Sequence, residues 1–234
     1  MELIEGIVVN TNKYQESSKI IYVLTKNEFK SLLVKSSLNY NSKNFAYSQE
    51  LTKIGFLCTE SNKNTFDIMK SGMVYETYKN IKDNYEKLLI VSKILNLVYR
   101  YHEHITDFSN IYNLLDYTNN GINNSNITNY KYYDIIFKSK FLYLLGSGPN
   151  FNGCTVCDKK DAHLSFSIQN GGLVCPKCRE GYTYSGEFVE VLKILYLGKI
   201  YILNDDLLNE LPDYYSLIND LLSKYYYHYY SIRI

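Results

Sequence analysis

The chain has 234 residues, of which 46% are hydrophobic and 21% charged, and its 25 basic and 24 acidic side chains leave a formal charge of +1. These proportions match ordinary globular proteins and exclude a globally disordered chain, while the length predicts more than one domain at about 100 to 150 residues each. No apolar run approaches the roughly 20 residues that cross a bilayer, and the first residues are acidic where a secretory signal is basic. We therefore expect a soluble cytoplasmic protein without a membrane partner.

The N-terminal third of the chain predicts β structure. Five runs rich in Ile, Val, Leu and Tyr recur there between short polar segments, at the spacing typical of small barrels and sandwiches. Five strands in so short a segment favour a closed barrel, because closure removes exposed sheet edges. The five-stranded OB-fold, which binds oligonucleotides, fits this pattern, and so does a small SH3-like barrel. The expected strands are Leu3–Asn10, Lys19–Thr25, Phe29–Lys35, Glu50–Thr59 and Thr65–Met73, within a domain of residues 1–78.

From Asp83 onward the apolar residues follow helical spacing. Asp83 and Glu86 form a capping-box pair, which predicts a helix from Asn84 to about His102. Residues 118–129 are almost entirely Asn, Thr, Ser and Gly, and this composition predicts a solvent-exposed connection. Further helices are expected at Phe108–Tyr117, Tyr130–Leu145, 187–197, 205–211 and 213–228, in a helical domain of residues 79–150 and 182–234.

Particular residues mark the expected ends of these helices. Gly146 stands where helices commonly end, and Pro149 follows shortly after. Ser185 is a candidate cap for the helix that begins near residue 187. The run Tyr225–Tyr230 holds five tyrosines, and this pattern near a C-terminus predicts one packed helix face with its hydroxyls in water.

Four of the five cysteines form two close pairs. Cys154-Thr-Val-Cys157 and Cys175-Pro-Lys-Cys178 are separated by seventeen residues, within the window for a site with four thiolate ligands. Four thiolates form the tetrahedral set that Zn²⁺ prefers and leave no open position, so we expect one structural zinc ion in a zinc-ribbon-like module of residues 151–181. A redox dithiol and an iron–sulfur cluster are the alternatives. His163 is not needed as a ligand, and Cys58, alone in a predicted strand, is expected to be a small buried hydrophobe.

Positive charge gathers in the predicted barrel. Residues 10–45 hold six lysines against two acids, Glu16 and Glu28. Ammonium groups release counterions from phosphates and so favour any nucleic acid, and aromatic rings among them can stack on unpaired bases. The alternative interpretation is a solvated barrel face with the aromatic residues in its core. The candidate DNA-binding residues are Lys13, Lys19, Lys26, Lys30, Lys35 and Lys43, and the candidate stacking residues are Tyr14, Tyr22, Phe29, Tyr40 and Phe45.

The sequence holds no recognisable catalytic motif. It contains no phosphate-binding loop, no dinucleotide fingerprint, no His-Glu-x-x-His and no nucleophile elbow. His102 and His104 do not share a helix face, which argues against a metal pair. We therefore expect a protein that is not an enzyme. The alternatives are a zinc-ribbon protein-interaction adaptor without DNA binding and a metal-dependent nuclease.

Three stretches resemble the RecO family of bacterial recombination mediators. The first runs from Glu5-Gly-Ile-Val-Val through Tyr14-Gln-Glu-Ser-Ser-Lys-Ile to Leu33-Val-Lys, and it looks like the N-terminal barrel of that family. The second is Phe137–Gly146 with the first cysteine pair after it, and it resembles the helix that enters the family's zinc module. The third is Gly171–Cys178, which resembles the second knuckle. Their order and spacing cover nearly the whole chain.

The resemblance implies an α+β multi-domain protein with an N-terminal five-stranded OB-fold barrel, a helical domain and an inserted module that carries the four paired cysteines. It also implies a DNA repair and recombination mediator that binds single- and double-stranded DNA, anneals complementary strands, associates with RecR, contacts the single-strand-binding protein and helps load RecA at the bacterial nucleoid. On this basis a hydrophobic pocket among the helices is expected to take the acidic tail of the single-strand-binding protein.

One departure from the family pattern concerns the expected DNA contacts. Members of the family commonly carry an arginine-containing basic cluster after the third strand. The corresponding segment here, Lys35–Lys43, holds two lysines and no arginine. Because lysine lacks the bidentate fork of arginine, the electrostatic part of the DNA affinity is expected to be weaker or shared with RecR.

Overall fold

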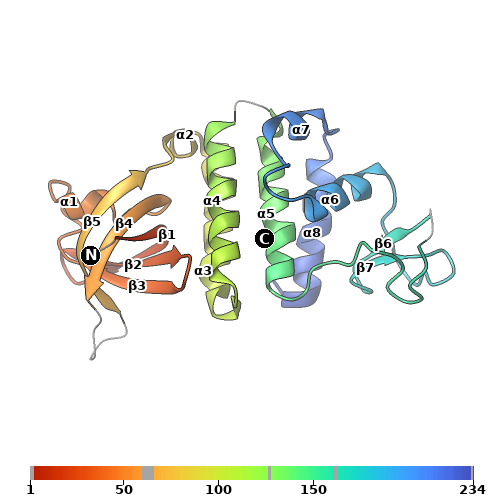
Figure 1. Ribbon diagram of the computed structural model, residues 1–234, viewed down its shortest axis with the longest axis horizontal. Coiled ribbons are helices and arrows are strands. Elements are labelled where there is room, and N and C mark those ends of the chain that lie inside the picture. The colour runs from red at the N-terminus through yellow and green to blue at the C-terminus, as the bar shows by residue number, and fades with distance from the viewer. Residues whose placement is uncertain (1–2, 60–65, 126–127, 161–162, 233) are drawn as a thin grey trace. The chain divides into compact units, whose positions relative to one another are not determined.

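The computed structural model describes residues 3–59, 66–125, 128–160, 163–232 and 234 (Figure 1). The chain divides into two compact units, Met1–Asn123 and Asn124–Ile234. The first unit therefore contains the barrel together with the first long helices. The division predicted from the sequence, at residue 78 and around residues 151–181, concerns which parts fold independently, and it stays a prediction.

The first unit is built on a closed barrel with the strand order β1-β2-β3-β5-β4. Its neighbouring strands pair antiparallel, except that β3 and β5 run parallel, with Leu32 opposite Asp67. The OB-fold class is thereby confirmed, and the five expected strands lie close to their predicted positions; Thr65, the first residue of the last expected strand, lies outside the described residues. The strands are β1 (Ile4–Tyr14), β2 (Ser18–Thr25), β3 (Phe29–Val34), β4 (Thr52–Thr59) and β5 (Asp67–Glu76).

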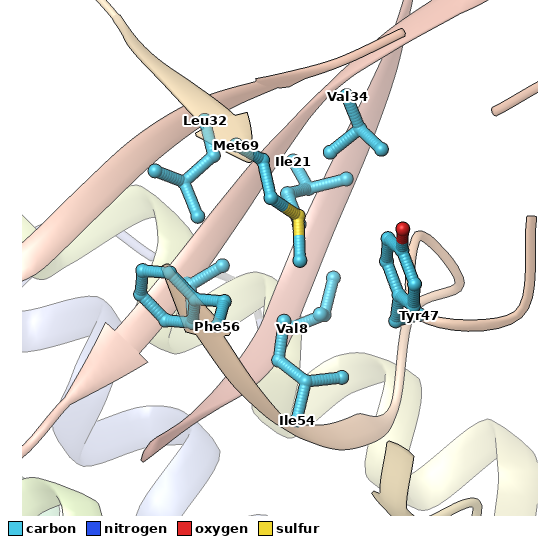
Figure 2. Close-up of a cluster of buried hydrophobic side chains, with 9 residues drawn as sticks. Val8, Ile21, Leu32, Val34, Tyr47, Ile54, Phe56 and Met69 are labelled. Atoms are coloured by element: carbon cyan, nitrogen blue, oxygen red, sulfur yellow. The ribbon is translucent and has the colours of Figure 1, made fainter. Parts of the chain in front are cut away.

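Alternating apolar residues on these strands form the barrel core. Figure 2 shows Met69 in the middle of this cluster, with Phe56 on one side and Tyr47, from the segment before β4, on the other. Burial of such side chains is the main favourable term in folding, at about 25 cal/mol per Å² of apolar surface. Cys58 packs against this core but is half-buried rather than buried. The buried core residues are Val8, Ile21, Val23, Leu32, Val34, Tyr47, Ile54, Phe56 and Met69.

Helix α3 (Tyr85–Tyr101) packs against β1 and begins one residue later than its sequence signal suggested. The cap is Asn84, whose Oδ1 accepts a hydrogen bond from the Lys87 N–H at 3.1 Å. The predicted capping role of Asp83 is therefore wrong, because Asp83 ends the preceding short helix α2 (Lys79–Lys82). The 3-10 helix η1 (His102–His104) follows directly, and the His102 ring stacks on Phe29 at 4.1 Å.

Helix α4 (Phe108–Asn124) continues far into the segment that was expected to be an exposed connection. That expectation was wrong. Thr118, Asn119 and Ile122 continue the helical spacing and are buried. Asn123 is held in place because its Oδ1 accepts from the Asn80 N–H at 3.1 Å and its carbonyl accepts from the Asn80 Nδ2 at 3.0 Å. Residues 126–127 of the expected connection lie outside the described residues, and η2 (Thr128–Lys131) follows them.

A charged network links α4 to the barrel. Lys53 Nζ on β4 lies 3.1 Å from Asp116 Oδ1 and 3.4 Å from Glu5 Oε1. The Tyr112 hydroxyl donates to Glu5 at 2.6 Å. Burial raises the pKa of Glu5, but the Tyr112 hydroxyl and the Lys53 ammonium outweigh it, and the pKa is lowered overall. Asp116, which stands apart in the sequence, is thus part of the contact that fixes α4.

The predicted helices of the second unit are confirmed. Gly146 adopts φ 83°, which suits glycine, and ends α5 as predicted, because Ser147 N–H then donates to Leu142 O at 3.0 Å. Ser185 does not cap α6; the cap position is Gly186 and it has no side-chain hydrogen bond. The helices are α5 (Tyr132–Leu144), α6 (Glu187–Leu197), α7 (Asp205–Glu210) and α8 (Tyr215–Tyr230).

Part of the tyrosine run on α8 forms a packed face, as predicted, whereas Tyr227 and Tyr229 are exposed. Tyr225 and Tyr226 are buried. Their hydroxyls are not in water, however: Tyr226 donates to Lys138 O at 2.7 Å, and Tyr225 donates to Ser147 O at 3.0 Å. A buried ion pair lies nearby, with Lys138 Nζ 2.6 Å from Asp134 Oδ2. Within the described residues, no helix combines the length and the apolar content that crossing a bilayer requires.

Candidate functional site

The four paired cysteines converge on one point in the second unit. Cys154 and Cys157 precede the short strand β6 (Ser165–Ser167), and Cys175 and Cys178 follow its partner β7 (Gly172–Val174). All four sulfurs lie within 4.8 Å of one another, and Cys157 Sγ is 3.7 Å from Cys175 Sγ. In a tetrahedral site with bonds of about 2.3 Å, neighbouring sulfurs are about 3.8 Å apart. The four cysteines therefore have the spacing of a metal centre.

Backbone turns hold each cysteine pair in place. The Asp158 N–H donates to Cys154 O at 2.8 Å, and the Cys178 N–H donates to Cys175 O at 3.0 Å. The β6–β7 hairpin brings the two turns together, and it depends on Gly172, where a Cβ would collide with the Asn150 carbonyl. His163 is exposed and is not part of the cluster found among the described residues.

The thiols of this cluster do not share one pKa. Burial opposes ionisation of Cys154, but hydrogen bonds with the backbone of Cys175 and Val156 prevail and lower the pKa to about 6. Contacts with the thiols of Cys157 and Cys175 raise the pKa of Cys178 to about 12. Four adjacent sulfurs therefore cannot all ionise near neutral pH unless a cation compensates their charge. Because four cysteine ligands fill a tetrahedral site, a metal held here has no open position for a substrate.

The six candidate lysines separate into two groups. Lys13 lies opposite Lys19 in the β1–β2 pair, and Lys19 lies opposite Val34 in the β2–β3 pair, so Lys35 follows at the same end of the barrel. Lys43 is the first residue of the short helix α1 (Lys43–Ala46). Asn44 of this helix donates from its Nδ2 to Lys35 O at 2.7 Å, which holds Lys35 and α1 together. We call these four lysines the loop-end lysines.

The other two lysines lie toward the opposite end of the barrel and have partners. Lys26 stands in the β2–β3 turn, and its Nζ lies 5.5 Å from the ring centre of Tyr112. Lys30 is only 12% exposed and forms ion pairs at 3.1 Å with both Glu28 and Asp67. Two carboxylates neutralise this ammonium, which leaves little field for a phosphate.

Lys19 differs from the other loop-end lysines because it is half-buried. Its Nζ donates to Ser48 O at 3.3 Å and lies 5.7 Å from the ring centre of Phe45. Burial lowers the pKa of Lys19, although Glu50 nearby opposes the change. Lys13, Lys35 and Lys43 are exposed, and none of the ion pairs within the described residues involves them.

The sequence analysis missed Asn44, which positions the segment between Lys35 and Lys43. An Asn among other Asn and Ser residues carries no distinguishing signal.

The comparisons with known proteins agree with this architecture. The family model for the C-terminal part of recombination protein O matches residues 82–205, more than half of the chain. The DNA repair protein RecO of Exiguobacterium sibiricum is 27% identical over 203 residues, which cover 84% of this chain and 78% of that protein. The RecO proteins of Listeria monocytogenes and Halalkalibacterium halodurans are 26% and 24% identical over 206 and 201 residues, covering 86% and 82% of this chain and 78% and 76% of theirs. This chain therefore belongs to the recombination protein O family.

Proposed function

We propose that this protein is a DNA repair and recombination mediator that binds single- and double-stranded DNA through the loop-end lysines. The observation that carries the proposal is the exposure of Lys13, Lys35 and Lys43 at one end of an OB-fold barrel, in a chain whose relatives are named DNA repair proteins. An OB-fold barrel offers its open face and flanking loops to oligonucleotides. Lys19 contributes charge and fixes the loop, whereas Lys26 and Lys30 contribute less.

The electrostatics predict binding without sequence preference. Each ammonium that neutralises a phosphate releases a condensed counterion, and the affinity then falls as salt rises. A lysine presents a point charge and reads no base edge. A surface of this kind suits a protein that must act wherever a gap in DNA arises.

The further steps of the proposal concern strands and partners. The protein anneals complementary strands and, with RecR, helps load RecA on DNA coated by the single-strand-binding protein. The acidic tail of that protein docks on apolar side chains of the second unit, and tethering raises the local concentration of the mediator. Ile194, Leu197 and Ile202 support this step, since they are exposed at the end of α6 and in the turn after it, near Lys199. The protein acts at the nucleoid, in the cytoplasm.

The metal in this proposal is one structural zinc ion held by Cys154, Cys157, Cys175 and Cys178. Zinc supplies folding energy to a module whose own core is small, and it takes no part in a reaction. The protein therefore acts by binding and positioning, without catalysing a chemical step.

The test is the salt dependence of binding to oligothymidylate in a filter assay. Replacing Lys35 and Lys43 by Ala should lower the slope of log affinity against log salt by about 1.4, since each phosphate contact on a single strand contributes about 0.7. The matched control replaces Lys79 and Lys93 by Ala, which removes the same charge from α2 and α3. Equal slopes for the two variants would move the DNA surface elsewhere. Absence of DNA binding by the wild type would favour the protein-interaction adaptor, and DNA cleavage that co-purifies with the protein would favour a nuclease.

A further inference from the structure

The five candidate stacking residues differ in how far other side chains of the protein cover their rings. Tyr22 lies against Tyr99 of α3, with ring centres 4.8 Å apart, and Phe29 stacks on His102. Helix α3 and η1 thus cover the aromatic residues of β2 and β3. Tyr14 packs edge-on against Phe66 at 5.3 Å. These three rings are occupied in packing within the protein.

Tyr40 is different, because 82% of it is exposed. Its ring lies against Phe45, with centres 4.7 Å apart, and Phe45 in turn lies beneath the Lys19 ammonium. The Tyr40 ring is therefore supported from one side, while most of its surface faces solvent. A large apolar ring in this position is not explained by packing of the barrel core.

The segment that carries Tyr40 is fixed to the barrel at several points. The Leu38 N–H donates to Ser17 O at 3.0 Å, which joins this segment to the β1–β2 turn. Ser42 caps α1 by accepting from the Asn44 N–H at 3.2 Å. Further along, Tyr47 lies buried beside the barrel core (Figure 2). Tyr40 is therefore held on a defined scaffold, and a ligand that contacts it meets a ring already in place.

The charged residues that neighbour Tyr40 in the sequence are all basic, although Glu50 lies near Lys19. Residues 29–49 contain Lys30, Lys35 and Lys43 and no Asp or Glu. Lys35 and Lys43 are exposed on either side of Tyr40 in the sequence, and Asn44 holds the α1 end of the loop against Lys35. Asn39 and Asn41 flank Tyr40 in the sequence and are exposed. Asn39 Oδ1 accepts from the Asn41 N–H at 3.0 Å, and the side-chain NH₂ groups of both residues can donate to the edge of a base. An exposed aromatic ring with an exposed lysine five residues before it and another three residues after it matches the base and the phosphates of a nucleotide.

We propose that Tyr40 is a stacking subsite for one unpaired nucleobase, with Lys35 and Lys43 holding the phosphates beside it. This inference rests on the proposed DNA binding and names the form of DNA that the site takes. In a duplex each base is stacked on its neighbours and has no free face, whereas a single strand offers its bases to aromatic side chains. Tyr40 therefore gives the protein a preference for single-stranded over double-stranded DNA.

Tryptophan fluorescence tests the subsite directly, because the chain contains no Trp. Tyr40→Trp places the sole indole of the protein at the subsite, and oligothymidylate should quench its emission as bases stack on it. The matched control is Tyr85→Trp, at a tyrosine in α3 that is 79% exposed. Quenching of Tyr40→Trp alone supports the subsite. Equal emission with and without DNA, while filter binding still shows a complex, overturns it and leaves the DNA-binding proposal standing.

Affinity measurements on three ligands give a second test. Stacking of one base contributes enough affinity that Tyr40→Ala should weaken binding to oligothymidylate by about 5- to 150-fold, while Tyr40→Phe stays close to the wild type. The same Tyr40→Ala change should leave binding to an abasic oligomer and to a duplex, as well as the salt slope, unaltered. An equal loss on all three ligands would contradict stacking. No binding of any ligand by the wild type would instead refute the DNA-binding proposal and the subsite together.

Discussion

Nine buried residues fill the barrel of the first unit, whereas the buried cluster at the cysteines contains, among the described residues, only Val174, Cys154 and Cys175. Phe151 and Phe166 of the cysteine module are also buried, but they lie against Tyr196 of α6 and Tyr225 of α8. The barrel can fold on apolar burial. The cysteine module is too small for that, since segments of about 40 residues or fewer usually need a metal, disulfides or a partner. Loss of a metal and loss of a core side chain should therefore affect different parts of one chain.

Removing one of the four candidate metal ligands has the largest expected effect. Cys154→Ser should abolish binding of the proposed zinc ion and leave residues 151–181 open to proteolysis, because zinc binding contributes about 10 to 16 kcal/mol to the folding of such modules. Metal analysis of the purified protein and limited proteolysis provide the measurements. Cys58→Ser is the matched control and should keep one zinc per chain, as Cys58 lies in the barrel. Resistance of residues 151–181 to proteolysis in the absence of metal would show that this module, like the barrel, folds without a metal.

Truncating a core side chain in the barrel should destabilise the barrel and leave the metal content unchanged. Phe56→Ala is expected to lower the free energy of unfolding by about 3 to 5 kcal/mol, since it removes a fully buried ring and leaves a cavity. Urea denaturation followed by circular dichroism measures the loss, and zinc content should remain at one per chain. Met73→Ala, at an exposed position on β5, should change stability by less than about 0.5 kcal/mol. Loss of zinc from Phe56→Ala would mean that the two regions fold as one.

The corrected helix cap gives a smaller effect in the first unit. Asn84→Ala should destabilise the unit by about 1 kcal/mol, because the Lys87 N–H loses its acceptor. Asp83→Ala should leave stability almost unchanged. Both are compared with the wild type by urea denaturation. The reverse order of the two variants would restore the capping box expected from the sequence.

Lys140, in the second unit, gives a prediction for how the free energy of unfolding depends on pH. Lys140 Nζ donates to Tyr196 O at 2.7 Å and to Gly198 O at 2.6 Å, and burial lowers its pKa to about 8. The pKa of an unfolded lysine is about 10.4, so between these values the unfolded chain binds more protons and the stability contributed by this group rises with pH. Lys140→Met lacks the titrating group. The difference in unfolding free energy between wild type and variant should therefore grow in favour of the wild type above pH 8, and a constant difference would contradict this assignment.

Much of the fold is predictable because it depends on patterns of residues that are close in the sequence. The barrel strands follow apolar runs such as Lys19–Thr25, and the four-cysteine cluster follows two Cys-x-x-Cys turns at a fixed separation. The end of α4 is not predictable in this way. Thr118 and Asn119 are poor helix formers, and only tertiary burial places them in a helix. Composition therefore indicated a connection where packing produced two further helical turns.

The candidate DNA surface shows the same limit for charge. Counting lysines treats Lys30 and Lys35 alike, yet Lys30 has two carboxylate partners and Lys35 is exposed. Residues distant in sequence, such as Asp67, decide which ammonium is available. The aromatic candidates divide for the same reason, because Tyr99 and His102 of the following helices cover two of them. Contacts between residues that are distant in the sequence therefore decide which lysines and aromatic side chains remain available to DNA, and the sequence alone does not give these contacts.

Hydrogen exchange with and without oligothymidylate tests most directly which of the two regions binds DNA. The loop-end lysines and Tyr40 predict slower exchange on DNA binding in residues 13–19 and 35–47, with residues 151–181 of the zinc-loaded protein unchanged. Protection confined to residues 151–181, with none in the barrel loops, would contradict the account.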